Sequence, residues 1–281
     1  MKAQVTLTVA EAKRLIAKAL ANEPAVQAAL HGGLVFLKGG TTVSAVAEEL
    51  TGQRLRVSGR ITPQGAKRAK AATEECHCML LERGSPVYVS DREMRSTVAR
   101  LGRGDVVITG ANALDIHGNA AIMAGSPFGG PPGEMLNGLI AEGVTVFVAV
   151  GLEKLIPGSI REAILACGRK SIDLSMGMPV GLIPVTGQVI TEVEALQRYA
   201  DVRCAVIGAG GILGAEGATT LVMEGETAEV QRAFELVLAV KGAETGGAPG
   251  SLPECEGFAQ CGGPHKTCIY AHPPKLTGSG F

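Results

Sequence analysis

The apolar positions in the first part of the chain form two kinds of pattern that alternate with each other. Short continuous apolar runs of strand length lie at 34–37, 106–109 and 144–150. Between them lie stretches such as 43–50, in which apolar residues recur at the three- and four-residue spacing of a helix. Strands that alternate with helices in this way are typical of βαβ units. The pattern predicts an α/β fold with an open, mostly parallel, Rossmann-like sheet and helices on both faces.

A different order of elements follows after about residue 180. Three strands and two helices are expected in the order β-α-β-β-α, at 180–190, 191–200, 202–208, 217–223 and 226–240. This order predicts a small α+β subdomain of ferredoxin-like character. The tail is rich in glycine, proline and cysteine and has no hydrophobic periodicity. We therefore expect a ligand-binding core at 1–178, the α+β subdomain at 179–242 and the tail at 243–281.

Composition and charge narrow the class of protein and its partners. The formal net charge is −1, and basic residues form only short clusters without a nucleic-acid-binding motif. No apolar run approaches the ~20 residues that a membrane-spanning helix needs, and the N-terminus has no apolar signal core. We expect a cytoplasmic homo-oligomer that binds a small anionic metabolite and neither nucleic acid nor a membrane. The seven cysteines then argue against a disulfide framework.

The first candidate site is the sequence Gly39-Gly40-Thr41-Thr42, which joins the apolar run at 34–37 to a helix. A turn from strand to helix places backbone N–H groups at the positive end of the helix dipole, where phosphate and other anions bind. The glycines allow a ligand to approach the backbone, and the threonine hydroxyls add donors. An ordinary turn with a threonine N-cap would use the same residues, so both interpretations stay open.

The second candidate site follows the run at 106–109 and contains Gly110, Asn112 and Asp115. Ligands of open α/β sheets bind at the carboxyl ends of strands, where Asp115 would act as a general base. Glu134 follows a loop rich in glycine and proline and is a second acid–base candidate. The alternatives are an Asx turn at Asp115 and a favourable helix-dipole interaction at Glu134.

The third candidate site is Glu153-Lys154, directly beyond the run at 144–150. Lys154 would neutralise a phosphate or an enolate, and Glu153 would serve as a base or nucleophile. A surface ion pair at the start of a helix is the alternative. The glycines at 208–214 do not have dinucleotide-binding spacing, and we expect no NAD.

Together these segments resemble the superfamily that joins ribose-phosphate isomerase, glucosamine-phosphate deaminase, the sugar-sensing domains of bacterial repressors and coenzyme A transferases. The loop at 39–42 is similar to the phosphate-binding loop of the isomerase branch, and the segment 110–115 is similar to its G-A-D-x-I-D sequence. Gly129, Gly130 and Glu134 look like the glycine-rich loop and glutamate that follow. The resemblance implies ligand binding by the glycines and by Asn112.

Two departures from the isomerase pattern affect the chemistry that the resemblance implies. Asn112 stands where the isomerase segment has an acidic residue, and Ile122-Met123-Ala124-Gly125 stands where a lysine precedes the glycines. The resemblance favours an isomerase-like or transferase-like enzyme with Asp115 and Glu134 as acid–base residues and Lys154 as a cation. A non-catalytic metabolite sensor with the same pocket is the alternative.

The tail carries a dense group of residues that could hold a metal. Three thiols and an imidazole lie within fourteen residues, at Cys255, Cys261, His265 and Cys268. Thiolate and imidazole ligands suit zinc or an iron–sulfur cluster, although this spacing is not a standard one for either. Structural or redox-active thiols are the alternative, and a third interpretation makes the whole chain a metal or redox protein.

Overall fold

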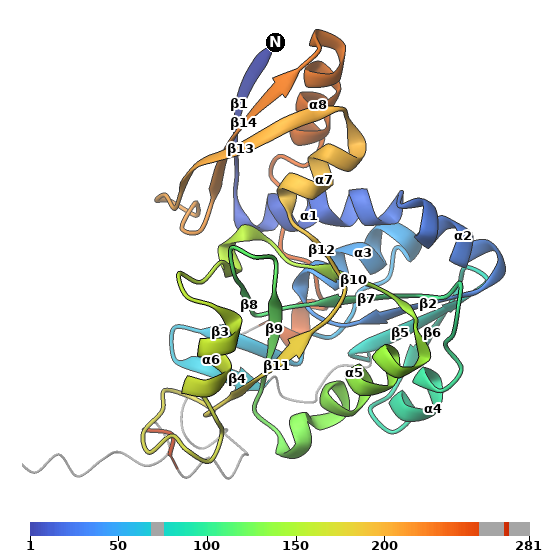
Figure 1. Cartoon of the computed structure of the whole chain (residues 1–281), viewed down its shortest axis with the longest axis vertical. Coiled ribbons are helices and arrows are strands. Elements are labelled where there is room, and N and C mark those ends of the chain that lie inside the picture. Colours follow the sequence, from blue (N-terminus) through green and yellow to red (C-terminus); the bar gives the residue numbers. More distant parts are fainter. Residues whose placement is uncertain (69–75, 253–266, 270–281) are drawn as a thin grey trace, which may run out of the picture.

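The fold is organised around a six-stranded sheet, seen in a computed structural model that describes residues 1–68, 76–252 and 267–269 (Figure 1). The strand order is β12-β10-β7-β2-β5-β6. The strands are β2 (Leu34–Lys38), β5 (Cys78–Glu82), β6 (Ser85–Val89), β7 (Val106–Gly110), β10 (Thr145–Ala149) and β12 (Gln188–Ile190). The three apolar runs form the centre of this sheet, because strands buried on both faces need apolar side chains in both directions.

The sheet is mixed. Strands β2, β7, β10 and β12 run parallel to their neighbours in this set. The hairpin of β5 and β6 then adds two antiparallel strands on the other side of β2. The predicted α/β class is confirmed, while the sheet is less uniformly parallel than the sequence pattern predicts.

Helices cover both faces of the sheet. One face packs against α1 (Val9–Ala21), α2 (Pro24–Gly32) and α3 (Thr41–Thr51), and the other against α4 (Met94–Val98) and α5 (Gly130–Glu142). Alternate residues of β2 point to opposite faces, so Val35 and Leu37 contact the first group and Phe36 the second. Each face therefore has its own buried apolar core.

A second, antiparallel sheet has the order β1-β14-β13 and packs against α8 (Thr227–Ala239). Its strands are β1 (Lys2–Leu7), β13 (Val202–Ala209) and β14 (Thr219–Gly225), and α7 (Glu192–Tyr199) precedes β13. The single strand expected at 180–190 is instead two strands in two different sheets, β11 (Gly181–Val185) and β12. Gly187 lies between them, where a Cβ atom would come within 2.6 Å of the Val146 carbonyl oxygen. The boundaries expected at 178 and 242 stay predictions.

Two small sheets lie beyond the carboxyl ends of the central parallel strands. One consists of β8 (Ala113–Leu114), β9 (Ala120–Ala124) and β11, and the other is the hairpin of β3 (Gly59–Thr62) and β4 (Gly65–Arg68). A hydrogen bond of 2.7 Å from Met178 N to the Ala66 carbonyl oxygen links the hairpin to the segment before β11. Short helical segments complete the fold: η1 (Pro127–Gly129), η2 (Leu152–Lys154), α6 (Ile160–Ala166) and η3 (Pro249–Ser251).

The described start of the tail packs back on the core. Ala248 N donates to the Leu55 carbonyl oxygen at 2.9 Å, and the Ser251 hydroxyl accepts from Val57 N at 3.0 Å. These contacts hold the segment that leads into β3. Throughout the described ranges, every helix is too short or too polar to cross a membrane.

Candidate functional site

A cavity of about 480 Å³ opens at the carboxyl ends of β2, β7 and β10. Its lining includes residues at the end of each strand and directly after it, at 39–42, 110–112, 150–151 and 153–154. These segments meet because β7 lies between β2 and β10 and all three strands are parallel. The chain leaves β2 toward β5 on one side and returns to β7 on the other, which is the kind of switch point where open α/β sheets bind ligands.

The loop between β2 and α3 exposes the start of the helix to this cavity. Gly39 N donates to the His77 carbonyl oxygen at 2.9 Å, and a Cβ atom on Gly39 would lie 1.9 Å from that oxygen. Gly40 caps α3 with φ 158° and ψ 166°, and as a glycine it has no side chain that could accept a hydrogen bond from the first turn. A threonine N-cap is therefore wrong for this turn. Thr41 and Thr42 both line the cavity, and N–H groups in the first turn of a helix have no partner within the helix itself.

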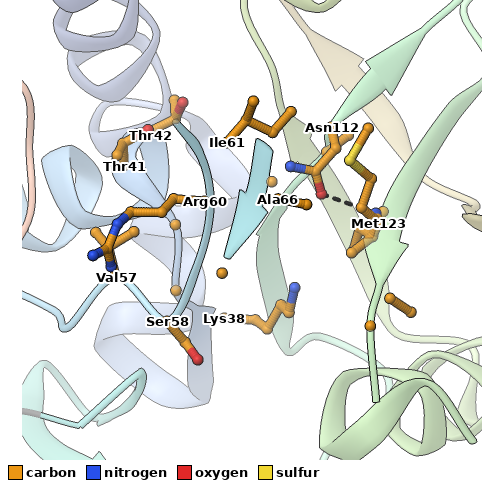
Figure 2. Close-up of a pocket in the computed structure, with 18 of the residues that line it drawn as sticks. Lys38, Thr41, Thr42, Val57, Ser58, Arg60, Ile61, Ala66, Asn112 and Met123 are labelled. Carbon is orange, nitrogen blue, oxygen red and sulfur yellow. Dashed lines mark hydrogen bonds between the residues drawn. The ribbon is translucent and has the colours of Figure 1, made fainter. Parts of the chain in front are cut away.

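Lys38, the last residue of β2, is a site residue that the sequence analysis missed. It is 5% exposed, lines the cavity and points across it toward the wall with Asn112 and Met123 (Figure 2). Within the described ranges, no side chain or backbone group forms a hydrogen bond or ion pair with its ammonium. Burial lowers the pKa of Lys38. The sequence signal that could have identified Lys38 is its place as a charged residue between the apolar run and Gly39.

Asn112 lies on the opposite wall of the cavity. Its Oδ1 accepts from Met123 N at 2.9 Å, which turns the amide nitrogen toward the cavity (Figure 2). Asn112 N donates to the Ala121 carbonyl oxygen at 2.8 Å, so its backbone is also fixed. Gly110, Gly129 and Gly130 line the cavity as well. The structure thus brings together all eight residues that the sequence analysis named as ligand-binding.

Asp115 is placed outside the cavity lining. Its buried carboxylate accepts from His117 N at 2.9 Å, from both the backbone and side chain of Asn119, and from Ile160 N at 3.1 Å. Burial alone would raise its pKa, but these donors hold the pKa at about 2. The bond from His117 N to the Asp115 side chain is an Asx turn, and Gly118 N donates to the main-chain carbonyl oxygen of Asp115, so the geometry favours the Asx-turn interpretation. A saturated carboxylate of low pKa is poorly suited to act as a general base.

Glu134 lies in the first part of α5, beyond the lining residues Gly129 and Gly130. The position of its side chain lies outside what the structure describes. Its acid–base role stays a prediction.

Glu153 and Lys154 both line the cavity, but the ion pair there involves a different lysine. Lys13 of α1 places Nζ 3.3 Å from Glu153 Oε1, and each side chain is 10% exposed. Burial lowers the pKa of Lys13 even though Glu153 favours its charged form. Behind this pair, Glu192 accepts from Leu152 N at 2.9 Å, and burial raises its pKa. The ion pair of Glu153 is thus a buried one with Lys13, and not the surface pair with Lys154 that the sequence left open.

The described lining of the cavity carries more positive than negative groups. The cationic side chains are Lys13, Lys38, Arg60, Lys67 and Lys154, and the carboxylates are Asp91 and Glu153. The His77 pKa falls to about 4, because of burial and the nearby Lys38, so the imidazole is neutral at pH 7. Because the whole chain has a net charge of −1, this surplus is a local property of the cavity. It would attract and hold an anion.

Of the four residues of the predicted metal site, only Cys268 lies among the described residues. Cys255, Cys261 and His265 lie outside the described residues. Cys268 is 2% exposed, and its neighbours Thr267 and Ile269 form backbone hydrogen bonds with Ser175. Across the ranges that the structure describes, His, Cys, Asp and Glu form no group of three suited to a metal ion. The zinc or iron–sulfur site stays a prediction.

Comparison with known proteins gives no family assignment. No protein-family model matches the chain, and no curated protein matches it. The cavity itself, whose volume lies in the range of small-molecule sites, is therefore the basis for a proposal about function.

Proposed function

We propose that the chain is an enzyme acting on a small phosphorylated or acyl metabolite, of the sugar-phosphate isomerase or coenzyme A transferase type. One observation carries the proposal: the N-terminus of α3, without a side-chain cap, opens into a cavity whose cationic residues outnumber its carboxylates. Helix dipole and cationic side chains act in the same direction there, and both favour an anion. The Rossmann-like description applies, in this proposal, to the parallel strands β2, β7, β10 and β12.

The proposed reaction uses two backbone N–H groups and three side chains of the cavity. The anionic group of the metabolite binds the N–H groups of Thr41 and Thr42. The amide nitrogen of Asn112 donates to a hydroxyl or carbonyl oxygen of the ligand. Lys154 stabilises negative charge that develops in the transition state. Glu153 takes the acid–base role in place of Asp115, because it lines the cavity and Asp115 does not.

Ligand-induced stabilisation tests the binding part of the proposal. We expect inorganic phosphate, ribose 5-phosphate or acetyl coenzyme A to raise the melting temperature, since a ligand at about 100 times its Kd stabilises the folded state by about 2.7 kcal/mol. Lys154→Ala should weaken this stabilisation. Lys2→Ala is the control and should leave it unchanged, because Lys2 is exposed and does not line the cavity. If none of the three compounds raises the melting temperature, the proposal fails.

A second measurement separates an enzyme from a sensor. Glu153→Gln, assayed well below its melting temperature, should keep ligand binding and lose turnover of the ribose or acyl compound that binds. Binding without turnover in the unaltered chain would favour the sensor instead.

A further inference from the structure

The environment of Lys38 differs from that of the other buried lysines of the cavity. Lys13 has the carboxylate of Glu153 at 3.3 Å, and Lys67 donates to the side-chain oxygen of Gln64. Lys38 has neither kind of partner among the described residues. Its amine opens on the cavity, where no described protein group holds it, and it is therefore available to a ligand.

The immediate neighbours of Lys38 are neutral and fully buried. Cys78 of β5 and Thr109 of β7 lie directly opposite it in the sheet, and both are 0% exposed. Burial raises the pKa of the Cys78 thiol to about 12, so this group supplies no negative charge at pH 7. Burial also favours the neutral form of the Lys38 amine, which is the form that has a lone pair for attack on carbon.

The loop that follows Lys38 supplies the second half of a site. Lys38 is separated from Thr41 only by Gly39 and Gly40, and both the amine and the start of α3 face the same cavity. A ligand whose anionic group is held at α3 and whose body extends across the cavity would meet the amine, which points toward the opposite wall. We propose that Lys38 forms an imine with an aldehyde or ketone whose phosphate or carboxylate group is bound at the N-terminus of α3. This inference rests on the proposed anion-binding function.

The chemistry of this step balances without any further reactant. The neutral Nζ attacks the carbonyl carbon and forms a carbinolamine. The carbonyl oxygen then leaves as water together with the two protons that the amine carried, and a carbon–nitrogen double bond remains. A proton from solvent converts this imine to the iminium. The positive iminium lies near the ligand's own anion, which supplies the counter-charge that the described surroundings of Lys38 do not. The iminium also acidifies the adjacent C–H bond, so that a base such as Glu153 can remove its proton.

Trapping with borohydride tests the imine directly. The full-length chain is incubated with dihydroxyacetone phosphate, pyruvate or uncharged hydroxyacetone, and sodium borohydride reduces any imine to a stable secondary amine. Peptide mass spectrometry then locates the adduct. We expect the phosphorylated ketone, the 2-oxo acid or both to label Lys38 at least about tenfold faster than the exposed Lys2, because the neutral fraction of an amine rises about tenfold for each unit by which its pKa falls. The two anionic probes distinguish a phosphate from a carboxylate requirement.

Controls separate this inference from the proposed function on which it rests. Lys38→Arg should abolish the adduct, while melting curves of this variant and of Lys38→Met verify that each is folded. Excess inorganic phosphate should slow the labelling of Lys38 and leave Lys2 unaffected. If an anionic probe raises the melting temperature but no adduct forms on Lys38, the imine is refuted and anion binding survives. If the probes neither bind nor label, both proposals fail. Equal labelling of Lys38 by hydroxyacetone would refute the requirement for an anionic ligand.

Discussion

Replacing Lys38 with methionine should make the folded chain more stable. Lys38 is 5% exposed, and its ammonium has no partner among the described residues. Methionine has a side chain of similar length without a charge, so Lys38→Met keeps most apolar contacts of the stem and removes the buried amine. This is the opposite of the usual result of a core substitution, which destabilises.

The expected magnitude follows from the burial of the amine. Burying an amide or hydroxyl without a hydrogen bond costs about 1–3 kcal/mol in mutational data, and we take this as the scale for an amine that opens on the cavity. Removing that group should therefore raise the free energy of unfolding by about 1–3 kcal/mol. With a shift of about 2–4 °C per kcal/mol for a chain of this size, the melting temperature should rise by roughly 2–12 °C.

The pH dependence of the same variant provides an independent measurement. The pKa of Lys38 is lowered from 10.5 in the folded state, so between the folded pKa and 10.5 the unfolded chain binds more protons. The stability of the unaltered chain then rises with pH in this window. The advantage of Lys38→Met should accordingly be largest below the folded pKa and shrink toward pH 10.5.

Urea denaturation of both chains at several pH values measures this difference. Lys13→Met is the matched control, because it leaves the buried Glu153 without its cation and should destabilise. If Lys38→Met instead lowers the free energy of unfolding by more than about 1 kcal/mol, the ammonium makes a stabilising contact and our account of Lys38 is refuted.

Three further substitutions test other parts of the site. Glu153→Gln should lower the free energy of unfolding by about 2–4 kcal/mol in urea denaturation, since Lys13 loses its charged partner. The double variant with Lys13→Met should regain part of this loss. Asp115→Asn should lower the melting temperature at pH 7 without altering the shift that phosphate produces; the folded pKa is about 2 and the unfolded value 3.8, so the difference should vanish as the pH falls from about 4 to about 2. Gly39→Ala should strongly reduce the yield of folded chain seen by circular dichroism, because its Cβ would lie 1.9 Å from the His77 carbonyl oxygen; normal folding would contradict this close approach.

The sequence predicts the position of the site because the relevant pattern is local. Each apolar run at 34–37, 106–109 and 144–150 is long enough for one strand, and each is followed by glycine within three residues. Parallel strands end at the same edge of a sheet, so the loops that follow neighbouring strands lie near one another. The cavity has this arrangement, since it is lined by residues 39–42, 110–112, 150–151 and 153–154.

The chemistry within the site depends on contacts that local patterns do not contain. Lys13 and Glu153 are far apart in sequence, and Lys13 lies in a helical stretch with nothing to mark it as a cavity residue. Asp115 has the sequence context of a catalytic carboxylate, yet Ile160 N, 45 residues away, takes up one of its oxygens. In the same way, β1 joins β14 from the opposite end of the chain, which no short-range periodicity indicates.

Lys13 and Lys38, two of the buried lysines of the cavity, illustrate how stability and function separate in this fold. Lys13 has a carboxylate partner, so a ligand gains little by neutralising it. Lys38 has no such partner among the described residues, so the folded state carries an unfavourable term that a suitable ligand removes. The free-energy cost of the unpartnered Lys38 amine should be recovered when a ligand binds and pairs with it. This recovered free energy adds to the stabilisation of the folded state by the ligand. The residue that weakens the empty protein is thus the one expected to contribute most to ligand binding, and Lys38→Met should lose in ligand-induced stabilisation at least what it gains in intrinsic stability.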